Sequence, residues 1–186
     1  MKNLENLFRF FRDNRKLPHK SKYHQEGYGE HCLLTIASAL DADASRPVLL
    51  AAALHDIAKP RTYKFDLLDN AYFDGHENVT VEELSQFLPK SDKDFDYVLL
   101  LIHYHMLPYK LETDNEEEKQ KVIKEIDDLV AKYSVIYPDF EKDLFILHCC
   151  NEHASLQGEI TKNDIDRMEK AKEWLLTYEL EESNND

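Results

Sequence analysis

The stretch VLLAAALHDIA, residues 48–58, constrains the fold most, because in a helix it would be apolar on nearly every side. Alanine and leucine are strong helix formers, and a helix that is apolar all round must be buried. Ser45 precedes the stretch as an expected N-cap, with Pro47 at an early helical position. We therefore expect a central buried helix. It runs into the polar pair His55-Asp56, which core packing does not require.

Most of the remaining chain also has helical periodicity, and its 4 glycines argue against a turn-rich all-β fold. The segment at residues 62–76 differs, because two aromatic-rich runs flank a Leu-Asp-Asn turn, as in a small β-hairpin. Thr161 is the expected cap of the last helix. The further expected helices lie at about residues 4–14, 28–40, 77–88, 95–106, 115–136, 140–156 and 163–180.

These elements predict an all-α protein with a short β-hairpin insertion. We expect one compact domain, in which residues 1–22 form an N-terminal helix and connection and residues 23–186 form the main helical bundle. The formal net charge of −14 repels phosphate backbones, so extended DNA binding is not expected. Only 3 cysteines are present and no apolar run reaches the ~20 residues that span a bilayer, so we expect a cytoplasmic protein without membrane contact.

The histidines gather on or beside the expected core helices. A single histidine on an apolar face is usually a hydrogen-bonded core residue. That interpretation weakens when several histidines accompany a carboxylate such as Asp56, because imidazoles and a carboxylate together suit divalent transition metals. The histidines concerned are His31, His55, His76, His103, His105, His148 and His153.

Four motifs in order resemble the HD superfamily of metal-dependent phosphohydrolases. They are His31, ALHDIAKP at 53–60, GHE at 75–77 and IHYHMLP at 102–108. The HD domain attached to CCA-adding tRNA nucleotidyltransferases is the most similar type, and the domains fused to RNA-end-healing polynucleotide kinases are also similar. The resemblance covers roughly residues 23–155. It implies a single HD-domain helical bundle.

The resemblance also implies a metal site. It makes His31, His55 and Asp56 ligands of a divalent cation. The candidate metals are Mn, Ni, Co, Fe, Zn and Mg, and one or two ions are expected per chain. The family's last ligand is an aspartate on a late helix, and its best match here is Asn151 in CCNEHA. An asparagine oxygen can coordinate but brings no charge, which lowers metal affinity. Two nearby carboxylates, Glu152 and Asp143, are alternatives for this position.

Further motif positions match residues that line the same cleft. His76 and His105 correspond to histidines that bind a second metal or the substrate phosphate, and Lys59 takes the lysine position of the HD-x-x-K pattern. His103 competes with His105, because two residues apart on a helix they cannot both face the cleft. His24 and Glu26 are additional cleft candidates, whereas His148 and His153 have no counterpart and are expected to be core or surface residues.

The resulting hypothesis is hydrolysis of a phosphoester or phosphoanhydride by a metal-activated water. Asp56, Lys59 and His76 are the expected catalytic residues, and Lys59, His76 and His105 the expected substrate-binding residues. The expected substrate is a small phosphorylated molecule of nucleotide type. A phosphorylated or 2′,3′-cyclic RNA end is an alternative, which a basic mouth around Lys59, Arg61 and Lys64 would accept.

Two other readings of the same residues stay open. Some HD proteins hold two irons and oxidise organophosphonates or polyols, and the histidines named above would serve that chemistry too. Alternatively, Asn151 in place of the family's aspartate leaves a degenerate metal site, and the chain is a non-catalytic module that binds a nucleotide.

Overall fold

A computed structural model describes residues 4–17, 26–67, 71–155 and 159–178. Helices dominate these residues, and the strands are a pair of two-residue segments, so the expected all-α class with a short hairpin is confirmed. The helical elements are α1 (Glu5–Asp13), α2 (Tyr28–Asp41), α3 (Arg46–Leu54), α4 (Lys59–Thr62), α5 (Val81–Leu84), α6 (Phe95–Tyr104), the 3₁₀ helix η1 (Pro108–Glu112), α7 (Glu116–Tyr133), α8 (Phe140–Ala154) and α9 (Lys162–Thr177).

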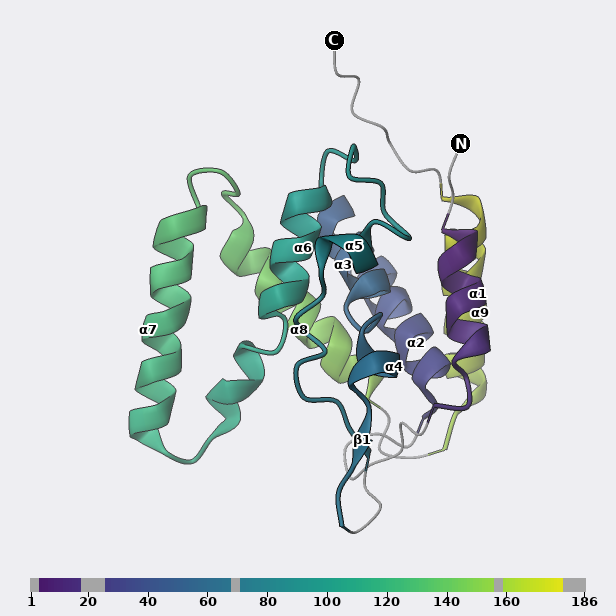
Figure 1. The fold of residues 1–186 in the computed structure, drawn as a ribbon, viewed down its shortest axis with the longest axis horizontal. Coiled ribbons are helices and arrows are strands. Elements are labelled where there is room, and N and C mark those ends of the chain that lie inside the picture. Colours follow the sequence, from purple (N-terminus) through teal and green to yellow (C-terminus); the bar gives the residue numbers. More distant parts are fainter. Residues whose placement is uncertain (1–3, 18–25, 68–70, 156–158, 179–186) are drawn as a thin grey trace.

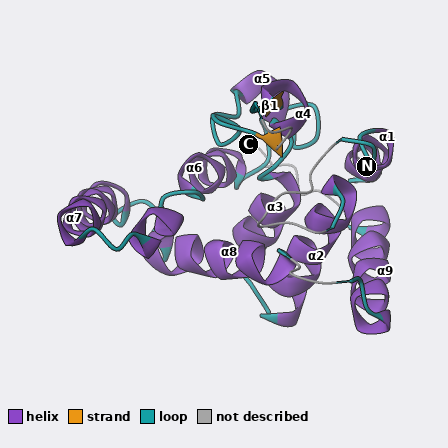
Figure 2. Ribbon diagram, turned by 90° about the horizontal axis from the view of Figure 1, so that it is seen from below, coloured by secondary structure: helices purple, strands orange, loops and turns teal. Residues whose placement is uncertain are grey.

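Helices α2, α3 and α8 form the centre of the molecule. Helix α2 packs against α8, α9 and α3, while α3 also packs against α6 and α8. Figure 1 shows α7 at one edge and the pair α1 and α9 at the opposite edge, and the view in Figure 2 gives the same order. As expected for its sequence, α3 is buried along most of its length, from Val48 to Leu54.

Helix α3 ends four residues earlier than the apolar pattern suggests. Ser45 stands at its N-cap position and Pro47 in its first turn, but after Leu54 the chain makes turns until α4 begins at Lys59. Pro60 in the first turn of α4 is compatible with a new helix start, where a missing N–H costs nothing. His55 and Asp56 therefore lie just beyond the end of a buried helix, with their side chains directed by a turn.

The hairpin joins β1 (Lys64–Phe65) to β2 (Ala71–Tyr72) as an antiparallel pair. It projects from the bundle beside α4, and its short strands pair Lys64 with Tyr72. The residues of the expected turn at 68–70 lie outside the described part. The hairpin's place in the chain brings His76, which follows it, back to the helical core, where it is buried.

The prediction of a helix over residues 77–88 was wrong, because only Val81–Leu84 is helical. Thr80 is in extended conformation and accepts a hydrogen bond from the Glu83 backbone, while the Glu83 carboxylate accepts one from the Thr80 backbone. This capping box fixes the helix start at Val81. Pro89 follows closely and disfavours helical conformation in the residue before it. Between these two limits only Val81–Leu84 is helical.

The other helices agree with the periodicity within a few residues. Thr161 caps α9 through a hydrogen bond from the Asp164 backbone, as expected. Helix α1 packs against α2 and α9, whereas the expected domain boundary at residues 22 and 23 lies outside the described residues and stays a prediction. Within the described residues, no helix has both the length and the apolar character that crossing a membrane requires.

Candidate metal centre

Five side chains from separate parts of the bundle meet around Asp56. All lie in buried positions, and several stand at the ends of helices, where the backbone changes direction. His31 lies in the first turns of α2, His55 directly follows α3, His76 follows the hairpin, His105 directly follows α6, and Asn151 lies on α8.

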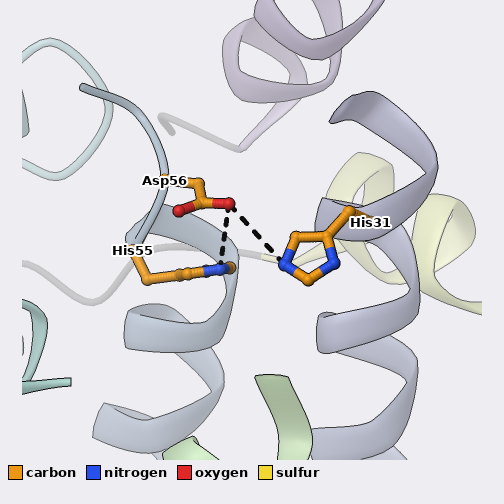
Figure 3. Close-up of side chains that lie close together, drawn as sticks. All are labelled: His31, His55 and Asp56. Carbon is orange, nitrogen blue, oxygen red and sulfur yellow. Dashed lines mark ion pairs between the residues drawn. The ribbon is translucent and has the colours of Figure 1, made fainter. Parts of the chain in front are cut away.

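The Asp56 carboxylate lies at the centre of this arrangement. Its Oδ2 atom lies 3.2 Å from His55 Nε2 and 3.7 Å from His31 Nε2, as Figure 3 shows. Its Oδ1 atom lies 3.5 Å from His76 Nε2. Each oxygen of this single carboxylate thus lies close to at least one imidazole nitrogen.

Two groups of possible metal ligands share Asp56. In the first, His31, His55 and Asp56 offer ligand atoms that lie within 4.8 Å of one another. In the second, the same limit holds for Asp56, His76 and His105. The Nε2 atoms of His76 and His105 are 3.2 Å apart. A carboxylate common to two such groups is suited to bridge two cations.

All four histidines are anchored through Nδ1. Three of these atoms contact the backbone carbonyl three residues earlier, and because a carbonyl only accepts hydrogen bonds, Nδ1 must carry the proton and donate. The contacts are His55 to Ala52 at 2.9 Å, His76 to Phe73 at 2.8 Å and His105 to Ile102 at 2.6 Å, while His31 Nδ1 contacts the Glu26 carboxylate at 3.1 Å.

Burial lowers the pKa of His76 and His105 and keeps both rings neutral, so each presents an Nε2 lone pair beside Asp56. A proton on Nδ1 leaves Nε2 as an acceptor, and the Nε2 atoms of His76 and His105 face each other. Among the described residues, His55 Nε2 and Asp56 Oδ1 are buried and have no hydrogen-bond partner. Such atoms are costly to bury, by about 1–3 kcal/mol each. A divalent cation would satisfy them, and anchored Nδ1 atoms are typical of metal-binding histidines, so the donor set fits a metal.

Lys59 contributes a buried positive charge. Its ammonium lies 2.7 Å from Asp56 Oδ2 and 5.2 Å from the centre of the Phe73 ring. Burial by itself would raise the pKa of Asp56, but the charges of His55 and Lys59 outweigh burial and hold this pKa well below its usual value. Asp56 is thus ionised and ready to bind a cation.

Asn151, and neither alternative carboxylate, lies beside His31. The Asn151 Oδ1 atom is 2.8 Å from His31 Nε2. Asp143 instead accepts hydrogen bonds from the hydroxyls of Tyr97 and Ser45. Glu152, although adjacent in sequence, turns to another side of α8 and is half-exposed. The first ligand group therefore has one carboxylate and an amide in the place where the family has a second carboxylate.

The remaining candidates are placed less centrally. His103 and His153 are exposed, and His24 lies outside the described residues. Glu26, expected only as a cleft residue, holds the His31 ring instead. Tyr28 was not anticipated, and its hydroxyl donates to the Asp56 carbonyl at 3.1 Å, which fixes the turn that carries Asp56. An aromatic residue on the buried face of α2 was its only signal in the sequence.

Divalent metal should stabilise the protein markedly. At a free concentration about 100 times the dissociation constant, Mn²⁺ is expected to add about 2.7 kcal/mol to the free energy of unfolding. For a chain of this size, Tm then rises by about 5–10 °C. Differential scanning fluorimetry of EDTA-treated protein with and without Mn²⁺ measures this shift. Most of it should vanish in Asp56→Ala, and a full shift in that variant would contradict the assignment.

The metal-free protein should lose stability when the pH falls below about 6.5. Burial lowers the pKa of His76 and His105, and positive charge on His76 and His55 lowers that of His105 further. Unfolded histidines have a pKa of about 6.5, so below this pH the unfolded chain binds more protons than the folded chain. Stability then falls by about 1.4 kcal/mol per group for each pH unit, until the folded pKa is reached.

Urea unfolding in EDTA at pH 7.5 and 5.5 checks this dependence. His105→Gln should reduce the difference between the two pH values, whereas the matched change at the exposed His103 should keep it. Equal pH dependence in wild type and His105→Gln would show that His105 is not the group responsible.

Comparison with known families agrees with this geometry. A family model described as HD domain matches residues 28–132, which is more than half of the 186-residue chain. The match runs from α2 into α7 and contains His31, His55, Asp56, His76 and His105, whereas Asn151 follows it. A search of curated proteins found no match.

Proposed function

The chain belongs to the HD domain family, whose superfamily comprises metal-dependent phosphohydrolases, and we propose that it hydrolyses a phosphoester or phosphoanhydride of a nucleotide-like molecule. The observation that carries this proposal is the ionised, buried Asp56 carboxylate, with imidazole Nε2 atoms on both of its oxygens. Such a centre is suited to hold positive charge beside a phosphoryl group.

The residues divide into two ligand sets. His31, His55, Asp56 and Asn151 would hold one cation, and Asp56, His76 and His105 would hold a second. When bound, such a cation lowers the pKa of a water molecule and polarises a phosphoryl oxygen. The contacts of Nδ1 with backbone carbonyls keep the rings of His55, His76 and His105 in the tautomer that presents Nε2 inward.

Lys59 and the second histidine pair would act on the substrate. Lys59 is only 6% exposed and its ammonium is fixed by Asp56 and Phe73, so it can neutralise charge on a phosphoryl oxygen without reorganising. His76 and His105 are kept neutral by burial, which suits them to bind a cation or to accept a proton from a substrate hydroxyl. These roles make Asp56, Lys59 and His76 the proposed catalytic groups.

A small substrate is favoured over a long nucleic acid. The chain's formal net charge is −14, and the basic mouth expected from the sequence is partly neutralised. Arg61 and Lys64 are both exposed, but Arg61 pairs with the Glu83 carboxylate and also donates to the Asn78 carbonyl at 2.7 Å. An RNA end, as the resemblance to CCA-adding and RNA-healing proteins implies, is a second substrate class to test.

A di-iron oxygenase is the alternative that the geometry itself raises. Asp56 is common to both ligand groups, and four imidazoles and one carboxylate also suit two iron ions. Oxygen consumption by the iron-loaded protein with an organophosphonate or polyol, without phosphate release, would favour this chemistry.

A substrate screen tests the proposal. Metal-free protein is incubated with nucleoside mono- and triphosphates, alarmone-type nucleotides, and 2′,3′-cyclic or phosphorylated RNA ends, in Mn²⁺, Ni²⁺, Mg²⁺ or EDTA. We expect metal-dependent release of phosphate or opening of the cyclic ester, abolished by EDTA. Tight nucleotide binding without turnover under every metal condition would instead identify a binding module.

A further inference from the structure

A second cluster of ligand-type side chains lies outside the centre around Asp56. Glu112 stands at the end of η1, and His148 and Glu152 lie one turn apart on α8. The three residues offer ligand atoms within 4.8 Å of one another. We call these three residues the outer cluster, and none of them belongs to the ligand groups around Asp56.

His148 is the unusual member of the outer cluster. It is only 9% exposed, and its Nδ1 atom is buried without a hydrogen-bond partner among the described residues. Its other nitrogen, Nε2, points to Glu152 but is 3.6 Å from Oε2, beyond hydrogen-bonding distance. Tyr109 packs edge-on against the ring, with centroids 4.4 Å apart, and holds it in this orientation. Neither nitrogen of this buried ring makes a hydrogen bond, which is costly, and Nε2, the nitrogen that faces Glu152, is the one that a cation shared with this carboxylate would bind.

The two carboxylates of the outer cluster also lack a counter-charge. Glu112 and Glu152 are close enough to interact directly, and burial together with this contact raises the pKa of Glu112. Two carboxylates in contact need a shared proton or a cation between them. No Lys or Arg side chain pairs with either carboxylate among the described residues. Their combination with an imidazole suits Mn²⁺ or Zn²⁺.

Tyr109 lies beside the outer cluster, and its hydroxyl also senses the charge of Asp56. Burial raises the pKa of its hydroxyl, and the charges of Glu152, Asp56 and Glu112 raise it further. The hydroxyl is therefore within electrostatic range of both places. An ion bound at the outer cluster would stand beside the Tyr109 ring, which packs on His148, on a chain that is otherwise strongly acidic.

We propose that Glu112, His148 and Glu152 form an outer divalent-cation site, separate from the centre at Asp56. The site can bind a cation whether or not the protein is a hydrolase, because its three ligand side chains lie together independently of Asp56. Its ligands are distinct from His31, His55, Asp56, His76 and His105.

Counting bound Mn²⁺ tests this site without any assay of activity. Electron paramagnetic resonance of free Mn²⁺ gives the number of ions bound and their affinity, for the full chain and for Asp56→Ala. We expect Asp56→Ala to retain one Mn²⁺ per chain. Adding Glu112→Gln and Glu152→Gln should weaken this binding at least about tenfold, since even changes in the partners of metal ligands cost about 10–100-fold.

Matched variants separate ligand loss from general effects. Glu141→Gln removes a carboxylate from an exposed position of α8, and His153→Ala removes an exposed histidine from the same helix. Both should leave the Mn²⁺ count unchanged, whereas His148→Ala should lower it. The Gln substitutions are at exposed residues and preserve side-chain size, so in the wild-type background they should lower the count by one. An unchanged count and affinity in that double variant would overturn the outer site.

Discussion

Asp56→Ala is expected to lower metal-dependent phosphoester hydrolysis at least about 1,000-fold, because this carboxylate belongs to both ligand groups. Its loss removes a ligand from each group at once, and no other carboxylate lies in either. Hydrolysis of a nitrophenyl phosphodiester, or of the best substrate from the screen, gives kcat and KM. We expect the loss in kcat, with little change in residual hydrolysis on adding EDTA.

Asp56→Ala has a second effect that needs a control. Lys59 is buried and would lose its ion partner, which costs about 3–5 kcal/mol for a buried pair. His55→Ala keeps the ion pair between Lys59 and Asp56 but removes a ligand, so it separates loss of function from loss of folding. It too should abolish turnover, with the far-UV circular dichroism of a folded helical protein.

His103→Ala is the matched negative control for these substitutions. It also removes a histidine near the centre, but this side chain is exposed and packs edge-on against Tyr104. Wild-type activity is expected. Metal-dependent hydrolysis that persists in both Asp56→Ala and His55→Ala would refute the centre as the site of catalysis.

The fold was predictable from the sequence where apolar periodicity is long and uninterrupted. Residues 48–54 show this, since all but the partly exposed Leu49 are buried, and so does α7, whose Val122, Ile126 and Leu129 face inward. Helix ends were less predictable, because they depend on competing local signals. The residues from Glu77 to Leu88 carry enough apolar positions for a helix, but between the Thr80 cap and Pro89 only Val81–Leu84 is helical.

The candidate site was predictable as a set of residues but not as a geometry. Spacing alone does not reveal that three histidines reach back to the carbonyl three residues earlier, because this contact depends on the turn in which each histidine lies. Nor does it decide between Asn151 and Glu152, which point about 100° apart on α8. The outer cluster was missed for a related reason, since Glu112 reaches His148 from an element distant in sequence.

Asn151→Asp is expected to raise the affinity for Mn²⁺ by about 10–100-fold. This is the factor by which metal affinity usually falls when a group that supports a metal ligand is removed. The Asn151 oxygen already lies 2.8 Å from His31 Nε2, in a buried position where a negative charge is weakly screened. A carboxylate of nearly the same shape adds attraction for a cation without moving any other ligand. Isothermal titration of metal-free protein with Mn²⁺ measures the change.

The same substitution should lower the stability of the metal-free protein. It buries a second carboxylate near Asp56, and like charges in a low-dielectric site raise the pKa of one and destabilise the ionised pair. We therefore expect a lower Tm in EDTA and a larger rise in Tm on adding Mn²⁺ than in wild type. His153→Asp places a new carboxylate on an exposed position of α8 and should produce neither effect. If Asn151→Asp binds Mn²⁺ no more tightly than wild type, Asn151 is not a ligand and only supports the His31 ring.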